Sequence, residues 1–219
     1  MVRFQKSRKG KVHFNKSVKV VAFDCDGVLF DTLQANKAFY NRILTHFGKP
    51  EMNPAQFAFA QMHPVEKTLA FLFSNENNLD AVHAYREHMN YVPLIALMEI
   101  EPNLKPLLKK LRPQYKTAVA TNRTDTIERV LTEFELKDDF DFVVCTRDVE
   151  RPKPYPDMLN KVSGYFRLKP QHIMYVGDSE LDQKAAHAAG TIFVAYRNRI
   201  LEADLHISTL KDLEKILQV

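Results

Sequence analysis

Strands and helices alternate regularly along the second half of this 219-residue chain. Short runs rich in β-branched residues predict strands, and each is followed by apolar residues at helical spacing. The expected strands span 116–120, 140–145, 172–176, 191–195 and 203–207. The expected helices span 104–111, 124–134, 158–166, 181–189 and 210–217. Such an order is typical of an α/β fold with a doubly wound parallel sheet and helices on both faces.

One more strand, at 18–23, comes long before the others. The segment 32–98 that follows it is rich in aromatic residues, has helical spacing and shows no convincing strand. We therefore expect a core built from residues 18–31 and 99–219. The all-helical segment 32–98 is expected to be inserted in that core as a cap over one end of the sheet.

Polar side chains collect where the expected strands end. In open α/β sheets, ligands bind outside the carboxyl ends of the strands. The residues expected there are Asp24, Asp26, Thr121, Asn122, Lys153, Asp178 and Asp182. Four carboxylates crowd together only if a cation neutralises them, and carboxylate oxygens suit Mg²⁺. A Mg²⁺ site with a lysine and hydroxyl or amide donors nearby is typical of phosphoryl transfer.

Four motifs in order resemble those of the haloacid dehalogenase superfamily. They are Asp24–Thr32 (DCDGVLFDT), Thr121-Asn122, Lys153 within KPYPD, and Gly177–Asp182 (GDSELD). The resemblance covers roughly residues 18–217 and is closest in pattern to phosphoglycolate phosphatase-like members with a helical cap. It implies a Rossmann-like core and a phosphatase, because Asp26 stands where the dehalogenases lack an aspartate.

The resemblance also implies a role for each catalytic residue. Asp24 would attack phosphorus, and Asp26 would protonate the leaving oxygen and then deprotonate the attacking water. Thr121 and Lys153 would bind the transferring phosphoryl group. Asn122 would position the substrate or the loop that carries the nucleophile.

A Mg²⁺ site is implied by the same resemblance. The carboxylates of Asp24 and Asp178 and the backbone carbonyl of Asp26 would bind the ion. Asp182 would support it through water or through contacts with its ligands. The expected activity is therefore Mg²⁺-dependent hydrolysis of a small phosphate monoester through an aspartyl-phosphate on Asp24.

Two alternatives remain open. One is a mutase on the same fold, which would pass the phosphoryl group to a sugar. The other follows from residues 1–17, which contain six basic and no acidic residues in a chain of net charge +4. Such an arm could dock the phosphatase on nucleic acid or another anionic surface, although a solvated arm is the simpler interpretation, and we expect no nucleic-acid partner.

The amino-acid composition also bears on the expected cellular location. Only two cysteines are present, which suits a reducing cytoplasm. No apolar run reaches the ~18 residues that a membrane helix needs, so no membrane association is expected. The identity of the substrate and the oligomeric state cannot be read from the sequence.

Overall fold

The computed structural model describes residues 17–63, 65–74, 78–112, 114–124 and 126–219. Apart from Ser17, the basic arm 1–17 lies outside the described residues. The chain divides into two compact units. One contains the chain up to Asp31 together with Glu99–Val219, and the other is Thr32–Met98.

The first unit is built on a six-stranded sheet in the order β5-β4-β1-β6-β7-β8, and every neighbouring pair is parallel. The strands are β1 (Val20–Phe23), β4 (Lys116–Ala120), β5 (Phe142–Val144), β6 (Ile173–Gly177), β7 (Ile192–Tyr196) and β8 (Leu205–Ile207). From β1 the chain winds outward through β4 and β5, then returns to the other side of β1 for β6, β7 and β8. The predicted α/β fold is confirmed, and the winding reverses at β1, where such sheets bind their ligands.

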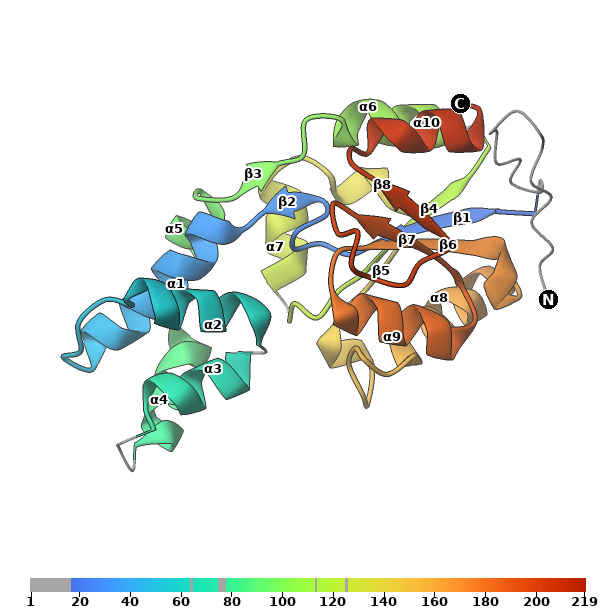
Figure 1. The fold of residues 1–219 in the computed structure, drawn as a ribbon. Coiled ribbons are helices and arrows are strands. Elements are labelled where there is room, and N and C mark those ends of the chain that lie inside the picture. The colour runs from blue at the N-terminus through green and yellow to red at the C-terminus, as the bar shows by residue number, and fades with distance from the viewer. Residues whose placement is uncertain (1–16, 64, 75–77, 113, 125) are drawn as a thin grey trace. The chain divides into compact units, whose positions relative to one another are not determined.

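Helices cover both faces of this sheet (Figure 1). They are α6 (Leu104–Leu111), α7 (Thr126–Glu133), α8 (Asp157–Phe166), α9 (Glu180–Ala189) and α10 (Lys211–Leu217). In Figure 1, α6 and α10 lie on one face, and α8 and α9 cover the other. The core under α8 and α9 is formed by alternate strand residues and apolar helix residues, including Val20, Ala22, Ala118, Tyr175, Phe193, Met158, Leu159, Val162, Ala185 and Ala186. Most predicted bounds agree with the observed ones to within two residues.

A two-stranded antiparallel sheet, which the sequence did not predict, joins the ends of the inserted segment. It pairs β2 (Phe30–Asp31) with β3 (Glu99–Ile100), Phe30 opposite Ile100 and Asp31 opposite Glu99. Two residues are too few to show the period-2 alternation that identifies a strand. The chain therefore leaves the first unit and returns to it through adjacent paired strands.

The second unit is entirely helical in the part that the structure describes. Its helices are α1 (Leu33–His46), α2 (Pro54–Met62), α3 (Val65–Leu72), α4 (Leu79–His88) and α5 (Val92–Ile95). The start of α2 is capped by Asn53 and Gln56, whose side chains each accept a hydrogen bond from the other's backbone N–H. The unit has a hydrophobic core of its own, which includes Phe39, Ile43, Leu69, Phe73 and Val82. Among the described residues, no helix is long and apolar enough to span a bilayer.

Candidate active site

Asp24 is the first residue after β1, at the carboxyl end of the central strand. Its backbone N–H donates to the carbonyl oxygen of Val176 on β6 at 2.9 Å, which continues the sheet by one residue. On the other side, Phe23 pairs with Val119 of β4, so Thr121 lies just beyond the same edge. The parallel register therefore brings the ends of β1, β4 and β6 together around a buried Asp24 side chain.

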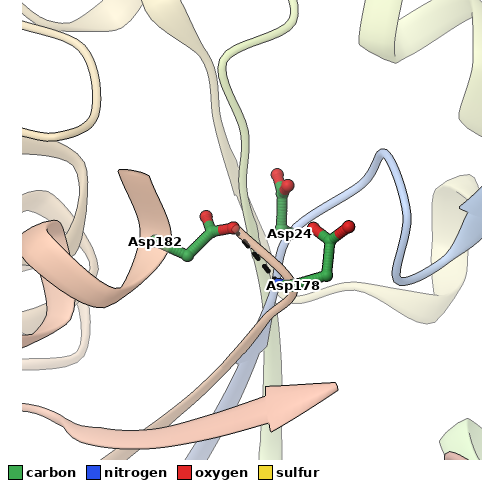
Figure 2. A group of neighbouring side chains, drawn as sticks. All are labelled: Asp24, Asp178 and Asp182. Atoms are coloured by element: carbon green, nitrogen blue, oxygen red, sulfur yellow. Dashed lines mark hydrogen bonds between the residues drawn. The ribbon is translucent and has the colours of Figure 1, made fainter. Parts of the chain in front are cut away.

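Three carboxylates meet at this edge (Figure 2). Asp24, Asp178 and Asp182 each offer an oxygen atom, and these atoms all lie within 4.8 Å of one another. Burial raises the pKa of Asp24 to about 7, although the charge of Lys153 opposes the shift. Burial and the charge of Asp24 raise the pKa of Asp178 to about 8. If all three carboxylates ionised, their negative charge would exceed what Lys153 neutralises, and the hard oxygen donors fit a divalent cation such as Mg²⁺.

Asp182 differs from the other two carboxylates because its oxygens already accept several hydrogen bonds. Its Oδ1 accepts from Lys153 Nζ at 2.7 Å and lies 2.7 Å from the hydroxyl of Tyr175. Its Oδ2 accepts from the Ser179 hydroxyl at 2.5 Å and from the Ser179 N–H at 3.1 Å. Burial alone would raise the pKa of Asp182, but Lys153 and these hydrogen bonds hold it below its ordinary value. Asp182 is therefore ionised, and it holds the side chains of Lys153, Tyr175 and Ser179 by hydrogen bonds.

Two glycines allow the carboxylates to approach so closely. A Cβ atom on Gly27 would collide with the carboxylate of Asp178, and a Cβ atom on Gly177 would collide with the side chain of Asp182. Gly27 also has φ +79°, a left-handed conformation that L side chains rarely adopt. The loop after β1 and the end of β6 can meet because these positions carry no side chain.

Lys153 places a buried positive charge among the acids. Its Nζ lies 2.8 Å from Asp24 Oδ1 and 2.7 Å from Asp182 Oδ1. Burial alone would lower the pKa of Lys153, but Asp182 and Asp24 raise it above its usual value, so the ammonium stays charged. The side chain is only 2% exposed.

Asn122 is used to hold the backbone of Lys153. Its Nδ2 donates to the Lys153 carbonyl oxygen at 3.0 Å, and its Oδ1 accepts from the Lys153 N–H at 3.0 Å. These reciprocal bonds join the loop after β4 to the loop that precedes α8. The role expected for Asn122, positioning the substrate or the nucleophile loop, remains a prediction.

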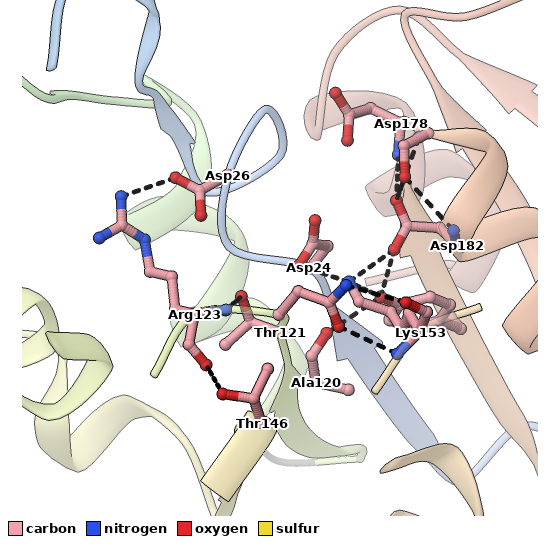
Figure 3. Close-up of polar contacts among 12 residues, drawn as sticks. Asp24, Asp26, Ala120, Thr121, Arg123, Thr146, Lys153, Asp178 and Asp182 are labelled. Atoms are coloured by element: carbon pink, nitrogen blue, oxygen red, sulfur yellow. Dashed lines mark hydrogen bonds and ion pairs between the residues drawn. The ribbon is translucent and has the colours of Figure 1, made fainter. Parts of the chain in front are cut away.

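Asp26 points toward an arginine rather than toward the other acids (Figure 3). Its Oδ1 accepts from Arg123 Nη2 at 2.7 Å. Arg123 is held in turn because its N–H donates to Thr121 Oγ1 at 3.2 Å and its carbonyl accepts from the Thr146 hydroxyl at 3.1 Å. Sequence reasoning missed Arg123, although its place directly after Thr121-Asn122 was a signal.

All seven predicted site residues thus lie in one unit. Asp24, Lys153 and Asp182 are buried and form a cluster with the half-buried Asp178, while Asn122 holds the Lys153 backbone. Thr121 is also buried and follows the neighbouring strand β4. Asp26 remains on the loop after Asp24, with its carboxylate on Arg123. A buried cluster of acids with one lysine, at the winding reversal of an α/β sheet, can hold a metal ion and a phosphate group together.

Comparison with known proteins identifies the family to which the chain belongs. A family model described as haloacid dehalogenase-like hydrolase matches residues 21–196. The phosphoglycolate phosphatase of Haemophilus influenzae is 28% identical over 195 residues, which is 82% of this chain and 86% of that protein. Pyrophosphatase PpaX of Bacillus cereus is 28% identical over 180 residues, covering 80% of this chain and 81% of that protein.

A solved structure agrees over most of the chain. The crystal structure of a HAD-superfamily hydrolase of subfamily IA, variant 1, from Geobacter sulfurreducens has a TM-score of 0.81 and 33% identity. The similarity covers 92% of this chain and 97% of that one. Since the family match runs from within β1 to the end of β7 and includes every predicted site residue, the chain belongs to the haloacid dehalogenase-like hydrolases and is one of the family's phosphatases.

Proposed function

We propose that this phosphatase hydrolyses a small phosphate monoester in two steps, with Mg²⁺ as cofactor and Asp24 as nucleophile. The observation that carries the proposal is the cluster in which the buried Asp24 lies beside the buried Lys153 and the half-buried Asp178. Within the described residues, the Lys153 ammonium, 2.8 Å away, is the one polar partner found for Asp24 Oδ1. A carboxylate oxygen that accepts few hydrogen bonds keeps lone pairs for attack on phosphorus or for a metal ion.

The carboxylates of Asp24 and Asp178 and the backbone carbonyl of Asp26 are the groups proposed to hold Mg²⁺. When bound, the ion supplies positive charge against the phosphoryl oxygens. Asp182 supports this site indirectly, because its oxygens already accept bonds from Lys153 and Ser179. Its part is to hold the lysine and the start of α9 in place.

In the first step a carboxylate oxygen of Asp24 attacks phosphorus, and the bond from phosphorus to the leaving oxygen breaks. Asp26 enters this step protonated on the oxygen that does not accept from Arg123, and it gives that proton to the leaving oxygen. In the second step water attacks the phosphorus of the aspartyl-phosphate, and Asp26 takes the proton from this water. The bond between phosphorus and Asp24 then breaks, which releases phosphate and restores the Asp24 carboxylate, while Asp26 is again protonated.

Thr121 and Lys153 are proposed to bind the oxygens of the transferring group. Both are buried, Lys153 against Asp24 and Thr121 just past the end of the neighbouring strand β4, and a buried hydroxyl or ammonium stabilises charge more strongly than in water. Asn122 acts through Lys153, because its amide holds that residue's backbone on both sides. Arg123 fixes where the carboxylate of Asp26 lies before substrate arrives.

Release of phosphate from 4-nitrophenyl phosphate tests this function. We expect turnover with Mg²⁺, none in excess EDTA, and none for Asp24→Asn. Activity that persists in EDTA would remove the metal from the mechanism. Transfer of the phosphoryl group to a sugar without free phosphate would favour a mutase instead.

The helical unit 32–98 is proposed to be a cap that sets substrate specificity. Because it has its own core, its replacement by a short linker between Asp31 and Glu99 should leave the catalytic unit folded. Phosphoglycolate and pyrophosphate, suggested by the names of the relatives, should be screened beside sugar phosphates and nucleotides. The replacement should flatten the ranking of these substrates, and an unchanged ranking would assign specificity to the catalytic unit.

A further inference from the structure

A tyrosine lies fully buried in the middle of the sheet, directly beneath the candidate active site. Tyr175 is the third residue of β6, and none of its surface is exposed. A phenolic hydroxyl in such a place needs polar partners, because an unpaired buried polar group costs free energy. All the partners found for this hydroxyl belong to the site or its edge.

The Tyr175 hydroxyl touches three groups from three parts of the chain. Lys153 Nζ donates to it at 2.9 Å. It lies 2.7 Å from Asp182 Oδ1 and 3.0 Å from the carbonyl oxygen of Ala120, either of which can accept its single proton. The hydroxyl thus links the last residue of β4 to the lysine and to the carboxylate that holds it.

Small residues on the intervening strand allow the Tyr175 side chain to extend from β6 to β4. The ring starts on β6 and its hydroxyl ends at β4, although β1 lies between these strands. At that level β1 carries Ala22, which pairs with Tyr175 on one side and with Ala118 on the other. All three residues lie in the core under α8 and α9. Two alanines therefore leave room for the tyrosine ring beneath the site.

The contacts restrict how the lysine ammonium can be turned. An ammonium has three N–H groups. Two of them are donated to Tyr175 and Asp182. The single N–H that remains is available to Asp24, whose Oδ1 is 2.8 Å from Nζ.

We propose that Tyr175 is a positioning residue for phosphoryl transfer, whose hydroxyl orients the Lys153 ammonium toward Asp24 and the phosphoryl group. This inference rests on the role proposed for Lys153 in catalysis. Tyr175 itself touches neither nucleophile nor substrate, and it acts only through Lys153 and Asp182. Its effect belongs to the transition state, where a misdirected ammonium stabilises the developing charge less well.

The test compares Tyr175→Phe with Tyr196→Phe in the full-length protein with Mg²⁺. Tyr196 is a matched control, because it is also a buried tyrosine of the sheet, and its hydroxyl lies 3.5 Å from Glu101 Oε1 instead of near Lys153. For Tyr175→Phe we expect kcat to fall roughly tenfold while KM changes less than about twofold. Inhibition by vanadate, which mimics the five-coordinate transition state, should weaken more than inhibition by inorganic phosphate. The Tyr196→Phe enzyme should keep both inhibition constants and kcat.

A second comparison separates positioning from a general effect on the core. In a Lys153→Met background, adding Tyr175→Phe should reduce the residual activity no further, because the hydroxyl then has no ammonium to orient. Thermal melting and circular dichroism check that each variant is folded. Three outcomes would each overturn this inference and leave the proposed function standing. They are equal kcat losses in the two phenylalanine variants, an unchanged kcat in Tyr175→Phe, and a second tenfold loss in the Lys153→Met background. A wild-type protein without phosphatase activity would overturn the proposed function and this inference together.

Discussion

The carboxylate of Asp178 fills the space beside the Cα atom of Gly27. A Cβ atom at position 27 would collide with this carboxylate, and the backbone there has φ +79°. Gly27 lies on the loop that follows Asp24 and Asp26, while Asp178 follows β6. The loop that carries Asp24 can therefore approach Asp178 this closely only because residue 27 has no side chain.

Gly27→Ala is expected to damage both the fold and the site. The left-handed backbone strains any L side chain, so the free energy of unfolding should fall by more than about 1 kcal/mol. Since Asp178 must also move, the rise in melting temperature produced by Mg²⁺ should shrink. Urea denaturation and thermal melting with and without Mg²⁺ measure the two effects.

Gly164→Ala is the matched control. Gly164 lies within α8, and a Cβ atom there would meet no heavy atom within 4 Å. Alanine favours a helix, so this variant should be more stable by about 0.5 kcal/mol and should keep the full Mg²⁺ response. A Gly27→Ala protein that behaves like it would contradict the close packing of Gly27 on Asp178.

Asp178→Asn should abolish stabilisation by Mg²⁺. Ligands that bind only the folded state raise the melting temperature, and removal of one charged oxygen donor weakens the site. The control is Asp141→Asn, because Asp141 precedes β5 and lies at the amino end of the sheet, away from the cluster. Thermal melting over a series of Mg²⁺ concentrations should show a rise for wild type and the control and none for Asp178→Asn. A normal rise in Asp178→Asn would exclude this residue as a ligand.

The sequence predicted which residues form the site better than it predicted how their side chains are arranged. Residue type and strand-end position were enough to select Asp24, Asp178, Asp182 and Lys153, because parallel strands bring their carboxyl ends to one edge. The direction of each side chain was not accessible in the same way. Asp26 is only two residues from Asp24, yet its carboxylate pairs with Arg123 on another loop.

The features that were missed depend on contacts between distant segments. Tyr175 looks like an ordinary β-strand residue, and its importance appears only when Ala22 and Ala118 are seen to leave room for its ring. The β2–β3 pair joins residues about seventy positions apart, and neither strand is long enough to show a period. Local patterns carry no information on such pairings.

Asp26→Asn should make the reaction sensitive to the leaving group. Asparagine cannot move a proton, and general acid–base help is typically worth ~10²–10⁴ in rate. An alkyl phosphate needs its leaving oxygen protonated, so its turnover should fall severely. With 4-nitrophenyl phosphate the first step needs little acid help, whereas attack by water still needs the base. Rapid mixing should therefore show a burst of nitrophenol without matching phosphate, and mass spectrometry should find the phosphate on Asp24. Equal losses for both substrates, with no burst, would contradict the role of Asp26.

Asp141 shows how a carboxylate outside the site contributes to stability. Its Oδ1 accepts from Lys116 Nζ at 2.8 Å and its Oδ2 accepts from the Thr117 N–H at 2.9 Å. Burial alone would raise the pKa of Asp141, but these bonds hold it below its ordinary value of 3.8. The contact ties the start of β5 to the start of β4.

The pKa of Asp141 is lower in the folded than in the unfolded protein, so the ionised carboxylate stabilises the fold above pH 3.8. This contribution is lost as the pH falls through the pKa of the folded protein. Asp141→Asn removes the charge at every pH. We therefore expect the variant to be less stable than wild type by up to about 1 kcal/mol at pH 7, since solvent screens part of the ion pair. The difference should stay constant down to about pH 5 and shrink toward pH 3. Urea denaturation of both proteins in EDTA, at pH values from 7 to 3, measures it. A difference that grows as the pH falls would show that Asp141 is not ionised in the folded protein.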